Sequence, residues 1–199
     1  FAREDKTLLL CCEEGEEEYE KKALDNVTVV TVDDEDELTA DFCRELLTAL
    51  HDAGVNTAVD TCLAVPEANL RKVIGLADTF LVDVKAIDSD LHRSLCGLPN
   101  ERILQNLRLL DALHQRVEIR IPFVPGQNTG EIGKIADFLA ALTCVVGVRV
   151  LPYHNLSGTK YESLDLRYPL ATVDTPIPTA AETEAARDVL AARGIRVLR

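Results

Sequence analysis

Residues 79–121 read TFLVDVKAIDSDLHRSLCGLPNERILQNLRLLDALHQRVEIRI. A short β-branched run occupies 79–83, a segment with helical spacing of apolar residues follows at 100–113, and a second β-branched run lies at 117–121. A strand, a helix and a strand in this order are typical of a parallel sheet whose connections are helices. The stretch therefore predicts an α/β fold.

The same alternation extends over the rest of the chain. Strands are predicted at 7–11, 27–32, 57–60, 79–83, 117–121, 147–151 and 195–198. Helices are predicted at 14–24, 39–53, 67–76, 100–113, 130–142 and 179–193. Seven strands and six helices suit a doubly wound sheet or a closed or partial (β/α) barrel. Because neither G-x-G-x-x-G after the first strand nor G-x-x-x-x-G-K-[ST] occurs, the barrel is favoured.

Composition limits the classes of protein to which the chain can belong. Of 199 residues, 47% are hydrophobic and 28% are charged, as in globular domains. No apolar run approaches the roughly 20 residues of a membrane span and no signal peptide is evident, so a soluble cytoplasmic protein without a membrane partner is expected. The net charge of -13 opposes binding to nucleic acid. The chain has no methionine, and we expect a fragment, a processed chain or an engineered sequence.

The acidity is concentrated near the start of the chain. Residues 1–41 hold 15 acidic and 4 basic side chains, a net charge of -11. The predicted organisation is a single domain over 1–199, in which 1–37 is an acidic βαβ-like edge segment and 38–199 forms the larger part of the barrel.

The cysteines and most of the histidines suggest no site. The six cysteines, at 11, 12, 43, 62, 96 and 144, contain no C-x-x-C pair and are expected to be reduced structural thiols. Cys43 and Cys144 have apolar neighbours and are expected in the core. His51, His92 and His114 have polar neighbours and are expected to be solvated.

Charged residues follow several of the predicted strands. In (β/α) barrels the reacting groups gather at the carboxyl ends of the strands. At these ends the sequence places Asp60-Thr61, Asp83 with Lys85, Arg120, and His154. We therefore expect two carboxylates, a lysine, an arginine and a histidine on one rim.

Three interpretations of this rim are open from the residues alone. The charges could form plain interior salt bridges, since unpaired charges are costly to desolvate. They could instead bind a zwitterionic ligand, with its carboxylate on Lys85 and Arg120 and its ammonium near Asp60 or Asp83. Lys85 could also be a Schiff-base lysine of the aldolase type.

Five sequence words carry a resemblance to a known family. They are AGVNTAVDT (53–61), VDVK (82–85), LHxxLxG (91–97), RIPxxPGxN (120–128) and LPYHNLxGxKY (151–161). In this order they resemble the glycyl radical enzyme activating enzymes, the radical S-adenosylmethionine (SAM) group typified by pyruvate formate-lyase activating enzyme. The resemblance implies a partial (β/α)6 barrel, a SAM cofactor, a four-iron four-sulfur cluster and a glycyl radical enzyme as partner.

The resemblance also implies roles for individual residues. Asp60, Thr61 and Asp83 match positions near the amino-acid part of SAM and an associated cation site. Lys85 matches the position that meets the SAM carboxylate. Arg120 matches a residue of the same pocket, and His154 one beside the adenosine.

Two family motifs are missing. The cluster is held in the family by C-x-x-x-C-x-x-C after the first strand, whereas this chain reads Cys11-Cys12-Glu13-Glu14 there. The family word Gly-Gly-Glu-Pro is replaced by Asp33-Asp34-Glu35-Asp36, in which only Glu35 is retained as a cofactor-binding residue.

These observations lead to one leading prediction and two alternatives. The leading one is an activating enzyme relative, whose family reaction is reductive SAM cleavage and formation of a glycyl radical on a partner, and which is inactive in this chain because the cluster ligands are absent. The alternatives are a catalytically silent barrel scaffold with a remnant SAM pocket and a Schiff-base lyase that uses Lys85.

Overall fold

The computed structural model describes residues 7–11, 27–31, 40–154 and 175–199. The chain divides into two compact units, Phe1–Thr57 and Ala58–Arg199. The single domain over 1–199, with its edge segment at 1–37, stays a prediction. Among the described residues, no helix has both the length and the apolar character needed to cross a membrane.

The described residues of the first unit form a parallel strand pair and one helix. Strands β1 (Thr7–Cys11) and β2 (Val27–Thr31) pair in register along their whole length. Helix α2 (Ala40–Asp52) follows, and Gly54 adopts φ 67 just beyond its end. This φ lies in the left-handed region, which favours glycine just after a helix end. The helix predicted at 14–24 lies outside the described residues.

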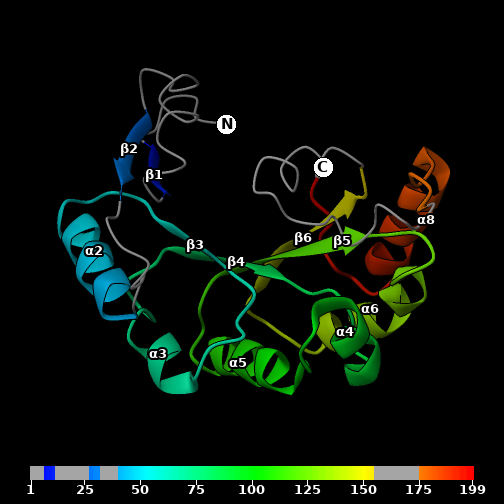
Figure 1. The fold of residues 1–199 in the computed structure, drawn as a ribbon, viewed down its shortest axis with the longest axis horizontal. Coiled ribbons are helices and arrows are strands. Elements are labelled where there is room, and N and C mark those ends of the chain that lie inside the picture. The colour runs from blue at the N-terminus through cyan, green and yellow to red at the C-terminus, as the bar shows by residue number, and fades with distance from the viewer. Residues whose placement is uncertain (1–6, 12–26, 32–39, 155–174) are drawn as a thin grey trace. The chain divides into compact units, whose positions relative to one another are not determined.

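The second unit is a four-stranded parallel sheet in the order β3-β4-β5-β6. Its strands are Ala58–Thr61, Thr79–Asp83, Val117–Phe123 and Val145–Pro152. The helices are α3 (Glu67–Arg71), α4 (Ser89–Cys96), α5 (Glu101–Ala112), α6 (Ile132–Ala140) and α8 (Ala180–Ala191), with a 3-10 turn η1 (Thr129–Glu131) before α6. Helices α3, α4 and α5 lie on one side of this sheet, below it in Figure 1. The α/β class with parallel strands is confirmed.

Burial alternates along the strands. Phe80 and Val82 of β4 and Val117 and Ile119 of β5 are fully buried, whereas the residues between them are partly exposed. Successive side chains of a strand point to opposite faces, so one face of the sheet forms the core and the other remains accessible. Asp83 and Arg120 belong to the accessible face because they alternate with the buried positions.

One predicted strand is wrong, and one helix was not predicted. Residues 195–198 form only a bridge between Val197 and Val148 instead of a seventh strand. Helix α4 was not predicted, because its eight residues are too few for a clear period. Its ends nevertheless carry local signals, since the Asp88 side chain accepts a hydrogen bond from the N–H of Leu91 and Gly97 ends the helix at φ 78.

His92 is buried, at 4% exposure, and its predicted solvation is therefore wrong. Its Nδ1 lies 2.7 Å from the carbonyl oxygen of Leu98 and joins α4 to the turn that follows. Cys144 is buried as predicted, whereas Cys43 is only half-buried.

Candidate functional site

A guanidinium and two carboxylates meet on the accessible face of the sheet. Arg120 Nε donates to Asp83 Oδ1 at 3.0 Å and its NH1 donates to Asp60 Oδ2 at 2.7 Å, while NH2 contacts both carboxylates. The strand register explains the meeting, because Asp83 lies opposite Arg120 and Asp60 lies opposite Leu81. One arginine on β5 therefore joins the carboxyl ends of β3, β4 and β5.

Lys85 extends this group beyond the end of β4. Its Nζ lies 3.5 Å from Asp83 Oδ2, and its side chain is 32% exposed. We call Asp60, Asp83, Lys85 and Arg120 the ion-pair cluster. It contains two negative and two positive groups, so its net charge is zero. A ligand that carries both an anionic and a cationic group can form ion pairs with it.

Exposure differs sharply between the two carboxylates. The Asp60 side chain is 61% exposed and that of Asp83 is 25% exposed, while Arg120 is 22% exposed. Burial would lower the pKa of Arg120, but its hydrogen bond to Asp60 and the charges of both carboxylates outweigh burial and raise it. The guanidinium is thus a permanent cation, and Asp60 is the more accessible anion.

Of the remaining predicted residues, the structure describes Thr61 and His154. Thr61 Oγ1 accepts a hydrogen bond from the N–H of Leu63 at 3.0 Å, which stabilises the turn after β3. His154 follows β6 as an exposed residue, and the structure does not bring it into the ion-pair cluster. Glu35 lies outside the described residues. The predicted rim is confirmed for Asp60, Asp83, Lys85 and Arg120, and for His154 it stays a prediction.

Four buried polar residues near the same edge were missed by sequence reasoning. Each forms hydrogen bonds with the backbone of a loop that follows a strand. The Glu131 side chain is 5% exposed, and each of the three asparagines is at most 3% exposed. They are Asn100, Asn106, Asn128 and Glu131. The only signal in the sequence was the word RIPxxPGxN, whose last residue is Asn128.

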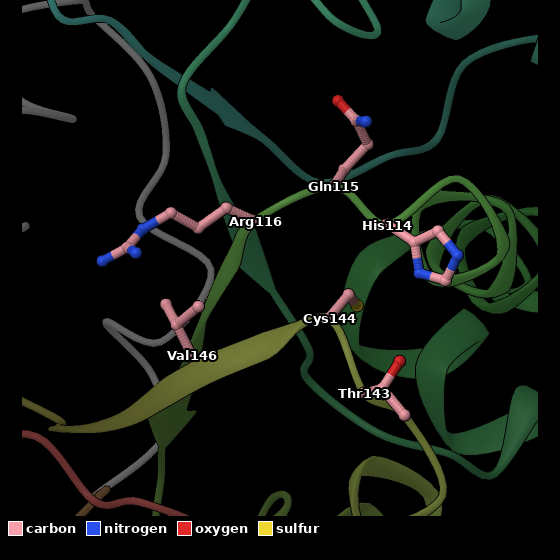
Figure 2. A pocket seen from close by; sticks show the side chains of 6 residues that line it. All are labelled: His114, Gln115, Arg116, Thr143, Cys144 and Val146. Atoms are coloured by element: carbon pink, nitrogen blue, oxygen red, sulfur yellow. The ribbon is translucent and has the colours of Figure 1, made fainter.

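A hollow of about 260 Å³ lies at the other edge of the sheet, beside the amino ends of β5 and β6. Figure 2 shows that the side chains of Gln115 and Arg116 point away from Cys144. Burial, followed by the charge of Asp111, raises the pKa of Cys144 to about 12, which leaves this thiol protonated and unreactive. This hollow is not the candidate site.

The donor sets for the two family cofactors differ. The ion-pair cluster offers cations to a carboxylate and anions to an ammonium, so it fits the amino-acid part of SAM. A cubane needs three thiolates around one site, and the chain contains no C-x-x-x-C-x-x-C. Within the described ranges, no three His, Cys, Asp or Glu side chains are grouped so as to hold a metal ion. The residues present therefore do not fit the cluster.

Comparison with known proteins defines the class. The sequence model of the radical SAM superfamily matches residues 12–139, and the chain belongs to this superfamily. Within it, the chain is 35% identical over 164 residues to the indoleacetate decarboxylase activating enzyme of Tractidigestivibacter scatoligenes, covering 81% of this chain and 51% of the relative. It is also 35% identical over 143 residues to the pyruvate formate-lyase-activating enzyme of Staphylococcus aureus (strain USA300), covering 68% of this chain and 57% of the relative. The chain thus spans about half the length of these relatives.

A solved structure agrees with the sequence relatives. A domain of pyruvate-formate lyase-activating enzyme from Bacteroides vulgatus ATCC 8482 superposes with a TM-score of 0.67 at 26% identity, covering 80% of this chain and 89% of that domain. The predicted resemblance to glycyl radical enzyme activating enzymes and the radical SAM type of α/β fold are confirmed.

Proposed function

We propose that this chain binds SAM at the carboxyl edge of its sheet, as part of a protein of the activating enzyme type. The supporting observation is the ion-pair cluster, in which Arg120 and Lys85 lie beside Asp60 and Asp83 on one accessible face. The amino-acid part of SAM carries one carboxylate and one ammonium. Two cations and two anions in contact are complementary to such a ligand.

Each residue has a distinct part in the proposed site. Lys85 contacts one carboxylate at 3.5 Å and is 32% exposed, so its ammonium is the cation best placed to accept a ligand carboxylate. Asp60 is the exposed anion and suits the ligand ammonium. Arg120 holds Asp60 and Asp83 side by side. Thr61, His154 and Glu35 complete the proposed set on the ground of the family resemblance.

The proposed partner is a glycyl radical enzyme, because the similar proteins are named as activating enzymes of pyruvate formate-lyase and indoleacetate decarboxylase. Lys85 and Asp60 would hold the amino-acid part of SAM, and SAM, when bound and reduced, would supply the chemistry of hydrogen abstraction. The residues of this chain do not fit the cluster that delivers the electron, so we propose that the chain by itself binds SAM without cleaving it. Cys43, Cys62, Cys96 and Cys144 are free thiols, which supports a reducing, cytoplasmic location.

Calorimetric titration with SAM tests the binding site. Replacing Lys85 by methionine keeps most of the side-chain volume and removes the cation, and we expect SAM affinity to fall by about tenfold or more because a charge-assisted contact is lost. The matched control is Arg71→Met, which removes an exposed cation on α3 that is paired with Glu67 and leaves the ion-pair cluster intact. Absence of SAM binding in the unaltered protein, or equal affinities of the two variants, would refute the proposed site.

Anaerobic iron–sulfur reconstitution tests the second part. We expect no stoichiometric four-iron four-sulfur absorption and no 5′-deoxyadenosine after addition of a reductant. Stoichiometric iron together with 5′-deoxyadenosine would show that the chain does assemble the cluster.

The Schiff-base alternative has a separate test. An imine-forming lysine attacks as a neutral amine, whereas Lys85 is ion-paired with Asp83. Borohydride treatment with small carbonyl compounds is expected to leave the mass of Lys85 unchanged, and a reduced adduct at Lys85 would favour the lyase.

A further inference from the structure

The backbone between β4 and α4 is hydrogen-bonded by side chains from distant parts of the chain. We call residues 84–88 the Lys85 segment. Asn128 Nδ2 donates to the carbonyl of Lys85 at 2.9 Å, and Asn100 Nδ2 donates to the carbonyls of the next two residues at 2.8 and 3.0 Å. Three consecutive carbonyls of the Lys85 segment are therefore bonded by buried amides.

The N–H groups at the end of the same segment are bonded by a carboxylate. Glu131 Oε2 accepts from the N–H of Ile87 at 2.9 Å and from that of Asp88 at 2.8 Å, while its Oε1 accepts from Lys134 Nζ at 2.7 Å. Burial would raise the pKa of Glu131, but the bonds from Lys134 and the two N–H groups outweigh burial and lower it. Glu131 is thus a buried anion, with its charge compensated by Lys134.

Asn128 also joins the segment to the next strand. Besides Lys85, its Nδ2 donates to the carbonyl of Pro122 at 2.6 Å, and its Oδ1 accepts from the N–H of Val124 at 2.9 Å. Pro122 lies two residues beyond Arg120 on β5. One amide therefore fixes the distance between the backbone that carries Lys85 and the backbone that carries Arg120.

Such bonding is unusual for a loop. Loops normally lie on the surface, where water bonds their backbone groups, because buried polar groups must be paired. Here Asn100, Asn128 and Glu131 are 2%, 3% and 4% exposed, and each forms at least one hydrogen bond with the backbone of the Lys85 segment. Side chains of a binding site keep their geometry only when the backbone under them is fixed.

We propose that Asn100, Asn128 and Glu131 are positioning residues for Lys85, which hold residues 84–88 so that the Lys85 ammonium stays beside Asp83 on the accessible face. They do not touch the ligand themselves. Their effect on SAM affinity rests on the proposed function. Their effect on the position of the Lys85 ammonium is independent of the proposed function.

The test compares Asn128→Ala with Asn106→Ala. Asn106 is a matched control because it is equally buried, at 3% exposure, and also donates to two loop carbonyls, those of Leu63 and Val65 after β3. Losing buried hydrogen bonds makes local opening easier, so we expect amide exchange in residues 84–88 to accelerate at least about tenfold in Asn128→Ala. In Asn106→Ala the exchange of residues 84–88 should stay within about twofold of the unaltered protein.

A second measurement reports on Lys85 directly. Trace acetylation, mapped by mass spectrometry, gives the rate at which Lys85 reacts relative to Lys72 in the same molecule. We expect this ratio to rise about fivefold in Asn128→Ala as the ammonium leaves Asp83, and to stay unchanged in Asn106→Ala. A merely structural role would move both variants equally, and that result, or no change in either, would overturn the inference.

Calorimetry with SAM then separates this inference from the proposed function. If the unaltered protein binds SAM, Asn128→Ala should weaken binding by at least about fivefold, and an unchanged affinity would overturn the positioning role. If the unaltered protein does not bind SAM, the proposed function fails, while exchange and acetylation still decide the place of Lys85. Should Asn128→Ala not fold, Glu131→Gln, again with Asn106→Ala as its control, supports or overturns the inference by the same readouts, since only the former alters a group that bonds the segment.

Discussion

Replacing Arg120 by lysine keeps the positive charge on β5 but removes the fork that bonds two carboxylates at once. If the lysine ammonium remains with the exposed Asp60, the bond to the less exposed Asp83 is lost, at a cost of about 1.5–3 kcal/mol. If it remains with Asp83, the loss at Asp60, whose side chain is 61% exposed, costs at most about 1 kcal/mol. In either case one ammonium replaces three donor nitrogens, so contacts with both carboxylates are lost, and we expect a destabilisation of about 2 kcal/mol.

Amide exchange of β4 and β5 measures this cost within the unit Ala58–Arg199 alone. A loss of about 2 kcal/mol corresponds to roughly thirtyfold faster exchange in these strands. The control is Arg149→Lys on the neighbouring strand, opposite Arg120. The Arg149 side chain is 40% exposed and bonds one carboxylate, that of Glu118, at 2.8 Å. We expect less than about 1 kcal/mol there. Equal acceleration in both variants would refute the argument that the two-carboxylate fork stabilises this edge of the sheet.

Three further results are expected. Because the pKa of Glu131 is lowered in the folded protein, its stabilisation is present above the unfolded value near 4.5 and is lost as pH falls through the folded value. The two amides bonded to it should lose protection on acidification, measured as their exchange rates relative to the intrinsic rates at each pH, and Glu131→Gln should remove this dependence. In Gly147→Ala the new Cβ would lie 2.7 Å from Leu198, so we expect a loss of about 1–3 kcal/mol by overpacking and faster exchange at the Leu198 amide, whereas unchanged exchange would contradict the packing argument. At pH 8 iodoacetamide should modify the exposed Cys62 and spare Cys144, whose pKa is about 12, and modification of both in the folded protein would disprove the burial argument.

The strand ends could be predicted from the sequence because they follow from topology. Parallel strands joined by helices bring all their carboxyl ends to one edge, so Asp60, Asp83 and Arg120 had to be neighbours once the strands were recognised. The pairing among them could not be predicted, since it depends on register. The structure shows Arg120 bonded to both carboxylates and Lys85 bonded to Asp83, so the salt-bridge interpretation correctly describes the protein without a ligand.

The groups that support the rim leave no periodic signal. Asn100 was predicted as the residue that opens a helix, and it does precede α5, but its side chain makes no capping hydrogen bond and bonds Ala86 and Ile87 instead. His92 was misjudged because its burial follows from how α4 meets the next turn, which the polarity of its sequence neighbours does not show. A local pattern cannot reveal a hydrogen bond between residues 13 or more positions apart.

Asn100 lies just before helix α5 and Asn106 lies within it, yet their side chains form hydrogen bonds with two different loops. Asn106 bonds the loop after β3, which carries Thr61, and Asn100 bonds the segment after β4, which carries Lys85. A helix is stiff over a few turns, so the two loops cannot shift independently while both amides remain bonded. A displacement of α5 would therefore move both sides of the proposed ligand site together. The accessible charges of the rim thus depend on the two buried amides of Asn100 and Asn106.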